Sequence, residues 1–234
     1  MGSSPKRSLS KARATHGWMV DVPHEFIFSD QHGPDAHQVT LPQIQGKPTY
    51  VDAQQRQSQG LKWLWRTHFR IHDFNWFMLV DDDTRVNVGA LSEFVQKYSP
   101  TFPMALGHIL HRRGRSSTDW FNGGAGVLFT RAAVEAIVEN LHSPVCPCRY
   151  GTPNDLYITS CCKPLGVLRV HTEKFSKDII GTERRCLAQE ISPEICLDPY
   201  ALAHHRVPWE TSSTMHLLLT NVTKYRLSPW NCSA

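Results

Sequence analysis

The chain has 234 residues and a mass of 26.6 kDa, which is enough for one large domain and too little for two full domains. Hydrophobic residues make up 41% of it and charged residues 20%, as in folded globular proteins, and this excludes a disordered chain. The formal net charge of +4 is too small and too scattered for a protein that binds nucleic acid electrostatically.

Short apolar runs alternate with stretches of helical spacing along the chain. Residues 1–14 are rich in Ser, Lys and Arg and are predicted to form a mobile tail, whereas residues 31–55 show no sustained period and are predicted to be an irregular connection. The same criteria predict strands at 26–30, 77–80, 104–106 and 127–129, and helices at 61–69, 88–98 and about 131–141, with Asn87 and Thr130 as N-caps. The alternation of strand and helix indicates an α/β sheet with helices on its faces.

The chain has seven cysteines, so at least one has no partner within it. The first four form a close group that could bind zinc, although it lacks the paired C-x-x-C spacing typical of zinc sites. Disulfides in an oxidising compartment are favoured over zinc, and reduced thiols are the third interpretation. N-glycosylation sequons at Asn221 and Asn231 also favour a secretory compartment. The cysteines are Cys146, Cys148, Cys161, Cys162, Cys186, Cys196 and Cys232.

Three adjacent carboxylates, Asp81, Asp82 and Asp83, follow the strand predicted at 77–80. In open α/β sheets ligands bind at the carboxyl ends of strands, and adjacent carboxylates repel one another unless a cation or a proton offsets the charge. A hard divalent cation such as Mg²⁺ or Mn²⁺ takes oxygen ligands and links them to phosphate oxygens. The pattern therefore suits a site for a metal and a nucleotide diphosphate, and the alternative is a solvent-facing acidic turn that caps the next helix.

Three further stretches carry candidate groups, and each has a purely structural alternative. Trp120 stands near the Gly-Gly-Ala-Gly run at 123–126, which lets the backbone approach a ligand closely or forms a simple turn between strands. Asp155 opens a weakly amphipathic helix, where the helix dipole alone would favour a carboxylate. His204 and His205 end a short apolar run, and a histidine pair of this kind is more often structural than metal-binding.

These motifs follow one another in a specific order. In that order they resemble the fringe and core 1 β1,3-galactosyltransferase family, from about Ala14 to Leu219. The C-terminal part is more similar to the core 1 branch and the N-terminal part to fringe, so the branch stays open. The motifs are Phe-Ile-Phe-Ser-Asp from Phe26, Trp-Phe-x-x-Val-Asp-Asp-Asp-Thr from Trp76, Gly-Gly-Ala-Gly from Gly123, Pro-Asn-Asp from Pro153 and His-Arg-Val from His205.

The resemblance implies a single-domain, Rossmann-like GT-A fold. The implied reaction is an inverting, metal-dependent β1,3-transfer of galactose or N-acetylglucosamine from a UDP-sugar to a hydroxyl of a glycan or glycoprotein. Mn²⁺ or Mg²⁺ is the implied cofactor. Because the metal neutralises the charge that develops on the leaving group, one catalytic base is sufficient, and no second protein residue is needed as an acid.

The family also implies a role for individual residues. Asp155 matches the catalytic base. Lys62 matches a basic position that could contact phosphate, with a surface lysine on a helix as the alternative. The implied metal ligands are Asp83, His205 and Asp81, and the implied donor-site residues are Asp81, Asp82, Lys62, Trp120, Gly123 and Gly124.

Two features depart from the family pattern. Family members usually begin with a cytoplasmic tail, a membrane anchor and a stem, whereas no run here approaches the roughly 18 apolar residues of a membrane span. The full-length form is therefore expected to be a type II membrane protein of the Golgi lumen or another secretory compartment, anchored by a segment absent here. The family's first strand is also not recognisable, because only a polar tail at 1–14 precedes the transferase domain predicted at 15–225. A C-terminal tail is predicted at 226–234.

Two other function classes compete with an active transferase. The first is a catalytically silent relative that binds glycans or assists folding, although retention of the three adjacent carboxylates and Asp155 argues against it. The second is a metal-dependent phosphohydrolase, which would need further His or Asp ligands at short spacing for a two-metal centre. No such ligands stand beside the carboxylates at 81–83.

Overall fold

The fold is known from a computed structural model of the full chain. It describes residues 18, 22, 24–29, 38–41, 50–69, 74–81, 84–111, 119–146, 154–176 and 201–205. The tails predicted at 1–14 and 226–234 lie outside these residues. In the described part of the chain, no helix is both long enough and apolar enough to cross a bilayer.

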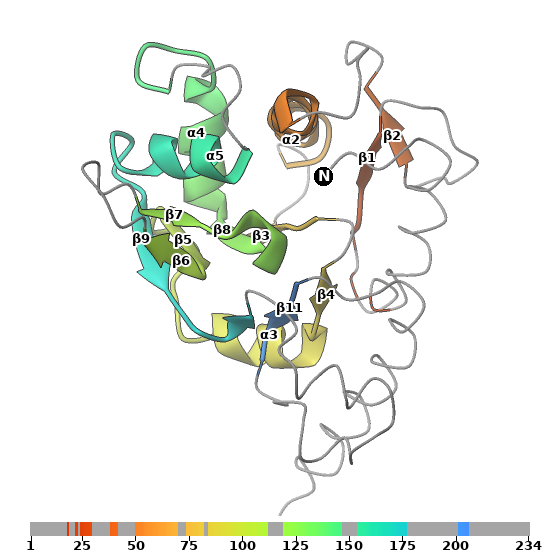
Figure 1. The fold of residues 1–234 in the computed structure, drawn as a ribbon, viewed down its shortest axis with the longest axis vertical. Helices are drawn as coiled ribbons and strands as arrows, with labels where there is room; N and C mark the ends of the chain where they lie inside the picture. The colour runs from red at the N-terminus through yellow and green to blue at the C-terminus, as the bar shows by residue number, and fades with distance from the viewer. Residues whose placement is uncertain are drawn as a thin grey trace, which may run out of the picture.

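A four-stranded mixed sheet forms the centre of the described structure (Figure 1). The strand order is β3-β8-β5-β9; β8 runs antiparallel to both of its neighbours, and β5 runs parallel to β9. These strands confirm three predicted ones, and their arrangement confirms the predicted α/β class. Their bounds are β3 (Trp76–Leu79), β8 (Val127–Thr130), β5 (Met104–Gly107) and β9 (Leu168–His171).

Three helices cover one face of this sheet, and a fourth helix lies on the opposite face (Figure 1). On β8, Val127 and Phe129 belong to the core beneath the three helices, whereas Leu128 belongs to the core on the other side. This alternation is the two-residue period of a strand buried on both faces. The covering helices are α2 (Tyr50–Leu64), α4 (Arg131–Asn140) and α5 (Asn154–Cys162), and α3 (Val88–Val95) lies opposite.

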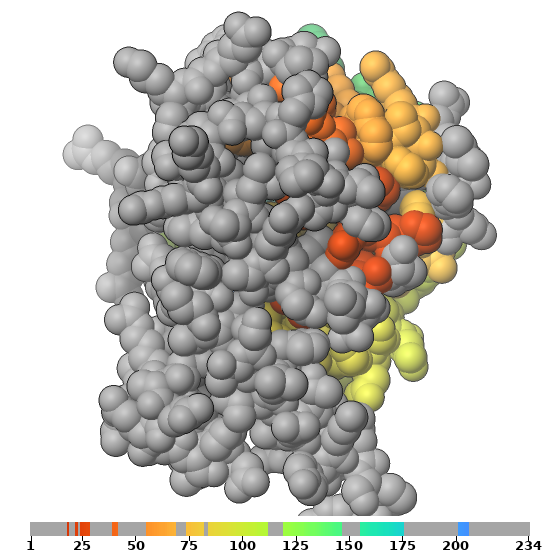
Figure 2. Space-filling view, turned by 90° about the vertical axis from the view of Figure 1, so that its right-hand side faces the viewer, coloured from red at the N-terminus to blue at the C-terminus, as the bar shows by residue number. Residues whose placement is uncertain are grey.

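Smaller pieces of sheet surround this centre. A three-stranded sheet on the α3 side has the order β10-β11-β4, and two further pairs are β1 with β2 (parallel) and β6 with β7 (antiparallel). Figure 2 shows the N-terminal segment in red-orange between α2 in orange and the yellow region of α3, and Ile27 packs against the α3-side core. The bounds are β1 (Ile27–Ser29), β2 (Gln38–Thr40), β4 (Arg85–Val86), β6 (Ile109–His111), β7 (Asp119–Phe121), β10 (Phe175–Ser176) and β11 (Ala203–His204).

Both predicted N-caps are confirmed. The Asn87 side chain accepts a hydrogen bond from the Ala90 amide at the start of α3, and the Thr130 hydroxyl accepts one from the Ala133 amide at the start of α4. Thr130 is fully buried, and its hydroxyl also accepts from the Met104 amide and donates to the Phe102 carbonyl. The Thr130 side chain therefore caps the start of α4 and also links β8 to β5.

The prediction that residues 31–55 form an irregular connection is wrong in two places. The structure has β2 at Gln38–Thr40, and α2 begins at Tyr50 rather than near Leu61. Helix α2 then continues into a π-helical turn, η2 (Trp65–Phe69). Apolar periodicity appears only in the second half of α2, where the buried Leu61 and Leu64 lie, so the polar first half gave no helical signal.

Two of the four grouped cysteines form a disulfide, the interpretation that the sequence favoured over zinc. Cys146 and Cys161 are bonded, with their Cα atoms 5.0 Å apart, a normal separation for a disulfide. The thiol of Cys162 is buried, and burial raises its pKa to about 12. The other four cysteines lie outside the described residues, so for them the expectation of disulfides is not tested.

Candidate active site

The candidate site begins where β3 ends at the predicted acidic run. The backbone N–H of Asp81 donates to the Thr84 hydroxyl, and the Thr84 N–H donates back to the Asp81 carbonyl, at 3.2 Å in both cases. The Thr84 hydroxyl in turn donates to the Gly124 carbonyl over 2.6 Å, and Thr84 is fully buried. Thr84 thus joins the acidic turn to the glycine segment forty positions later in the sequence.

Antiparallel pairing explains why these two segments meet. Leu79 at the end of β3 is in register with Val127 at the start of β8, so the residues after β3 lie beside those before β8. The segment before β8 is a 3₁₀ turn, η3 (Gly123–Ala125), in which the Asn122 side chain accepts from the Ala125 amide. The Asn122 amide donates to the His108 carbonyl at the end of β5, which fixes the turn to a second strand.

The glycines of this turn admit two functional side chains. A Cβ atom at Gly123 would stand 2.9 Å from the Asp155 Cβ, and a Cβ at Gly124 would overlap the His205 imidazole. Both positions therefore need glycine for close approach. The sequence predicted that these glycines let the backbone approach a ligand; the structure shows that they let a carboxylate and an imidazole approach the backbone.

Asp155 lies in the first turn of α5, as predicted. Its Oδ1 accepts from the Leu156 amide at 2.8 Å, and its Oδ2 accepts from the Gly123 amide at 3.4 Å. Burial raises the pKa of this carboxyl group, and the backbone donors and the nearby His205 oppose the rise without cancelling it. A carboxylate with a raised pKa accepts a proton more readily than an ordinary aspartate, which suits a general base.

His205 reaches the site through a short strand pairing. β11 pairs with β4 through Ala203 and Val86, and with β10 through Ala203 and Phe175. Because β4 directly follows the acidic run, this pairing returns the chain to the acidic turn and sets His205 over Gly124. The structure therefore brings Asp81, Asp155, His205, Gly123 and Gly124 together from four separate parts of the sequence.

The remaining predicted site residues lie elsewhere or outside the described chain. Asp82 and Asp83 are not among the described residues, so their predicted roles are not tested. The Lys62 ammonium donates to the Leu141 carbonyl at 3.3 Å and is not brought to this cluster; burial and Arg66 lower its pKa. Trp120 is half-buried on β7 opposite Leu110, and alternation along the strand directs it away from the face of the buried Phe121.

The groups present fit a hard divalent cation in their chemistry. Carboxylate oxygens and one imidazole nitrogen are ligands that Mn²⁺ accepts, and Asp81 and His205 are both linked to Gly124, one through Thr84 and the other directly. In the part of the chain that the structure describes, no group of three or more His, Cys, Asp or Glu side chains is arranged to hold a metal. The predicted ligand Asp83 lies outside that part, so the metal site stays a prediction.

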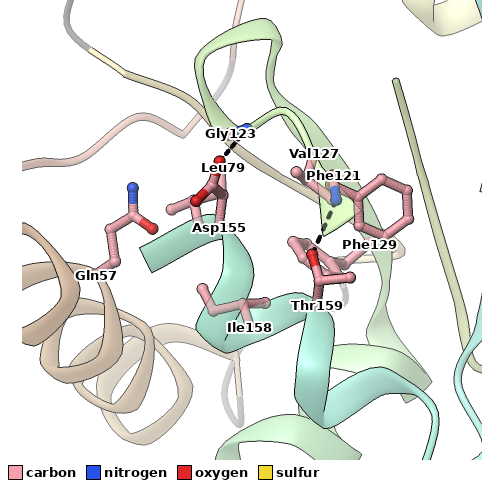
Figure 3. A pocket seen from close by; sticks show the side chains of 9 residues that line it. All are labelled: Gln57, Leu79, Phe121, Gly123, Val127, Phe129, Asp155, Ile158 and Thr159. Carbon is pink, nitrogen blue, oxygen red and sulfur yellow. Dashed lines mark hydrogen bonds between the residues drawn. The ribbon is translucent and has the colours of Figure 1, made fainter. Parts of the chain in front are cut away.

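A small pocket beside Asp155 adds residues that the sequence did not indicate (Figure 3). The Thr159 hydroxyl, one turn after Asp155 on α5, accepts from the Phe121 amide at 3.0 Å and so joins α5 to β7. Gln57 of α2 faces the pocket from the other side. The lining residues are Gln57, Leu79, Phe121, Gly123, Val127, Phe129, Asp155, Ile158 and Thr159.

The sequence analysis did not identify Thr84, Gln57 or Thr159, and only Thr84 stands in a local pattern that could have indicated its role. A threonine directly after an acidic turn commonly bonds to the backbone within the turn. Gln57 sits in a polar, glutamine-rich stretch, and Thr159 sits in a helix with no clear amphipathic pattern. Their partners come from distant segments, which no local pattern reveals.

Comparisons with known proteins find a family match and similar curated proteins. A sequence model described as Fringe-like matches residues 14–205. A mouse protein named beta-1,3-glucosyltransferase is 28% identical over 116 residues, which are 49% of this chain and 22% of that protein. The human protein of the same name is 28% identical over 102 residues, which are 43% and 20% of the two chains. The chain thus spans about a fifth of the length of these curated relatives.

Proposed function

Because the chain belongs to the Fringe-like family of glycosyltransferases, we propose that it is an inverting, metal-dependent β1,3-glycosyltransferase. It would move a hexose from a UDP-sugar to a hydroxyl of a glycan or glycoprotein acceptor. The observation that supports this proposal best is the convergence of Asp155 and His205 on adjacent glycines, beside the turn that Asp81 opens. The central mixed sheet with helices on both faces is consistent with a GT-A-like fold.

In this proposal Asp155 is the catalytic base. An inverting transfer needs one carboxylate beside the acceptor hydroxyl, which removes its proton as the oxygen attacks the anomeric carbon. The raised pKa of Asp155 and its two backbone donors give a carboxylate that is held in place and is basic enough for this step. The bond from the sugar to the diphosphate breaks on the opposite face, and the diphosphate leaves with the electron pair.

The diphosphate is expected at the acidic turn. Asp83, His205 and Asp81 would hold Mn²⁺ or Mg²⁺, which supplies compensation for the charge that develops on the leaving group. Asp82, Gly123 and Gly124 would contact the donor. Trp120, also predicted for the sugar or acceptor wall, is a weaker candidate, because it faces away from the pocket-lining Phe121 on β7. Lys62 is the weakest of the predicted donor contacts, because its ammonium is bound to the Leu141 carbonyl.

The donor sugar has three candidates. The family resemblance suggested galactose or N-acetylglucosamine, and the names of the mouse and human relatives add glucose. A thermal-shift screen with Mn²⁺ and UDP-galactose, UDP-N-acetylglucosamine and UDP-glucose would identify the donor, because a ligand that binds the folded state raises the melting temperature.

Fringe-like glycosyltransferases are secretory-pathway enzymes. We propose the Golgi lumen for this chain, with the full-length protein anchored as a type II membrane protein. The disulfide between Cys146 and Cys161 supports this compartment, because disulfides persist in oxidising environments.

A UDP-release assay tests the proposed reaction. UDP release that requires both Mn²⁺ and an acceptor supports transfer. Acceptor-independent release of inorganic phosphate would support hydrolysis instead, and sugar binding without turnover would support a silent relative. As a test of the metal site, Asp83→Ala should abolish the Mn²⁺ dependence of UDP binding in calorimetry; unchanged Mn²⁺-linked affinity would reject that ligand.

A further inference from the structure

Gln57 occupies a position between the two functional carboxylates that no motif indicated. It lies on α2 one turn before Leu61, which packs in the same core as Ile158 of α5. This face of α2 therefore looks toward α5, and Gln57 lines the pocket together with Asp155 and Gly123 (Figure 3).

The carboxamide of Gln57 has a defined orientation. Its Nε2 donates to Asp81 Oδ1 over 3.5 Å, and a carboxylate can only accept, so this contact fixes which end of the amide faces Asp81. The other end, Oε1, then lies on the side of Asp155 (Figure 3). Oε1 is buried and accepts no hydrogen bond from any described residue, and buried carbonyl oxygens normally have a donor.

We propose that Oε1 of Gln57 accepts a hydrogen bond from a hydroxyl group of the donor sugar. The inference rests on the proposed function, because it assumes that a UDP-sugar binds at the acidic turn. The sugar of such a donor must extend from the diphosphate at Asp81 toward the base at Asp155, and Gln57 spans that interval. The adjoining walls, Leu79, Val127 and Ile158, are apolar and offer no competing acceptor from their side chains.

The geometry makes Gln57 a specificity-determining residue. A carboxamide oxygen held in this orientation can only accept, so it requires a hydroxyl at the matching ring position. A site built to bind a hydroxyl strongly disfavours the analogue without it, because a buried polar group is then left unpaired. UDP itself lacks the sugar and would be insensitive to this contact.

Calorimetry with Mn²⁺ tests the proposal without any turnover. Gln57→Leu keeps the approximate side-chain volume and removes both Oε1 and the Nε2 donor to Asp81. The lost contact to Asp81 acts on UDP and UDP-hexose alike, so the ratio of UDP-hexose affinity to UDP affinity isolates Oε1, and we expect this ratio to fall at least tenfold, as expected for a lost buried hydrogen bond. Gln59→Leu is the matched control, because the Gln59 Oε1 is also buried without a donor among the described residues but does not line the pocket.

A ligand-side measurement needs no variant. Wild-type protein should bind one monodeoxy analogue of the UDP-hexose at least tenfold more weakly than the parent, and Gln57→Leu should bind the two alike. If Gln57→Leu binds the UDP-hexose as tightly as wild type, or if every deoxy analogue binds as the parent does, this inference is overturned and the proposed function stands. If wild type binds neither UDP nor any UDP-hexose, the proposed function fails and the inference fails with it.

Discussion

Asp155 is a carboxyl group under opposing influences. Burial raises its pKa, whereas the Leu156 and Gly123 amides and the His205 imidazole lower it, and burial is the strongest of these. Folding therefore favours the protonated form more than the unfolded chain does, so the stability that this group contributes is present at low pH and is lost as the pH rises through its folded pKa. A residue that costs stability when it is charged is typical of a functional site.

The first prediction concerns the charge on Asp155. Asp155→Asn should lower turnover by about a hundredfold or more, the usual effect of losing a general base, while UDP-sugar affinity stays close to wild type. In the wild type, kcat should rise with pH as Asp155 ionises, and the midpoint should lie above the ordinary range of an aspartate because its pKa is raised. Steady-state kinetics across pH measures both effects. Wild-type turnover in the variant would remove Asp155 from the mechanism.

Thr84 supports the second prediction. Its hydroxyl accepts from the Asp81 amide and donates to the Gly124 carbonyl within a fully buried environment. Thr84→Val has nearly the same shape but leaves both backbone groups without this partner, so we expect a loss of about 1–3 kcal/mol in the free energy of unfolding. Urea denaturation measures this loss.

Ligand binding separates a positioning role of Thr84 from a merely stabilising one. Because Thr84 holds the acidic turn against the segment under His205, Thr84→Val should also weaken Mn²⁺-dependent UDP binding by about tenfold. Thr84→Ser keeps the hydroxyl and should restore UDP affinity. A folded Thr84→Val protein with unchanged UDP affinity would limit Thr84 to a stabilising role.

Helix α5 is the element that carries the candidate base, and three contacts hold it. At its start Asp155 accepts from the Gly123 amide, one turn later Thr159 accepts from the Phe121 amide, and near its end Cys161 is bonded to Cys146. These contacts join the helix to the glycine turn, to β7 and to the segment after α4. The position of Asp155 thus depends on the whole helix rather than on its first turn alone.

The third prediction tests the covalent attachment of α5. Replacing both Cys146 and Cys161 by serine should lower the free energy of unfolding by about 3 kcal/mol, because a disulfide that closes a loop of this length restricts the unfolded chain by roughly that amount. Guanidinium denaturation measures the difference. Cys162→Ala is the control, because it alters a buried cysteine next to Cys161 and leaves the disulfide intact. An equal loss in the control would show that packing, not the bond, is responsible.

The elements with local signals were predicted correctly from the sequence. Strand β3 is a short apolar run ending at carboxylates, and α3 and α4 begin at side chains that cap their own helices. The first half of α2 was missed because its residues are polar and only the buried Leu61 and Leu64 carry the packing. Two-residue strands such as β4 and β11 have no pattern of their own, since they exist only through pairing with distant segments.

The candidate site was also predicted only where its residues stand in recognisable motifs. Asp155, the glycine turn and His205 were identified through the order of the motifs, and the structure brings them together. Gln57 and Thr159 were missed because each acts through a partner on another element, Asp81 for the first and the Phe121 amide for the second. A sequence pattern identifies a reactive group more readily than the residues that hold it.

At the scale of the whole molecule, one strand belongs to two cores. Phe129 of β8 is buried with Tyr157 and Ile158 beneath α2, α4 and α5, whereas its neighbour Leu128 is buried with Leu106 on the α3 side. The two cores share the backbone of the same sheet. Loss of either core therefore weakens the support of the other.

The fourth prediction follows from this shared sheet. Phe129→Ala should cost about 3–5 kcal/mol and Leu128→Ala about 2–5 kcal/mol, the usual range for large-to-small changes in a core. Both variants should still unfold in one transition, with circular dichroism and tryptophan fluorescence giving the same midpoint. Two separate transitions in either variant would show that the cores are independent.

The late return of the chain to the acidic turn affects biosynthesis. The ribosome synthesises the carboxylates and the glycine turn long before it synthesises β11. This strand pairs with β4 and positions His205. A nascent polypeptide halted before that strand contains all four strands of the central sheet and the base but not the imidazole. Translation thus orders the assembly of the centre, and under the proposed function sugar transfer begins only after the last of its partners has emerged.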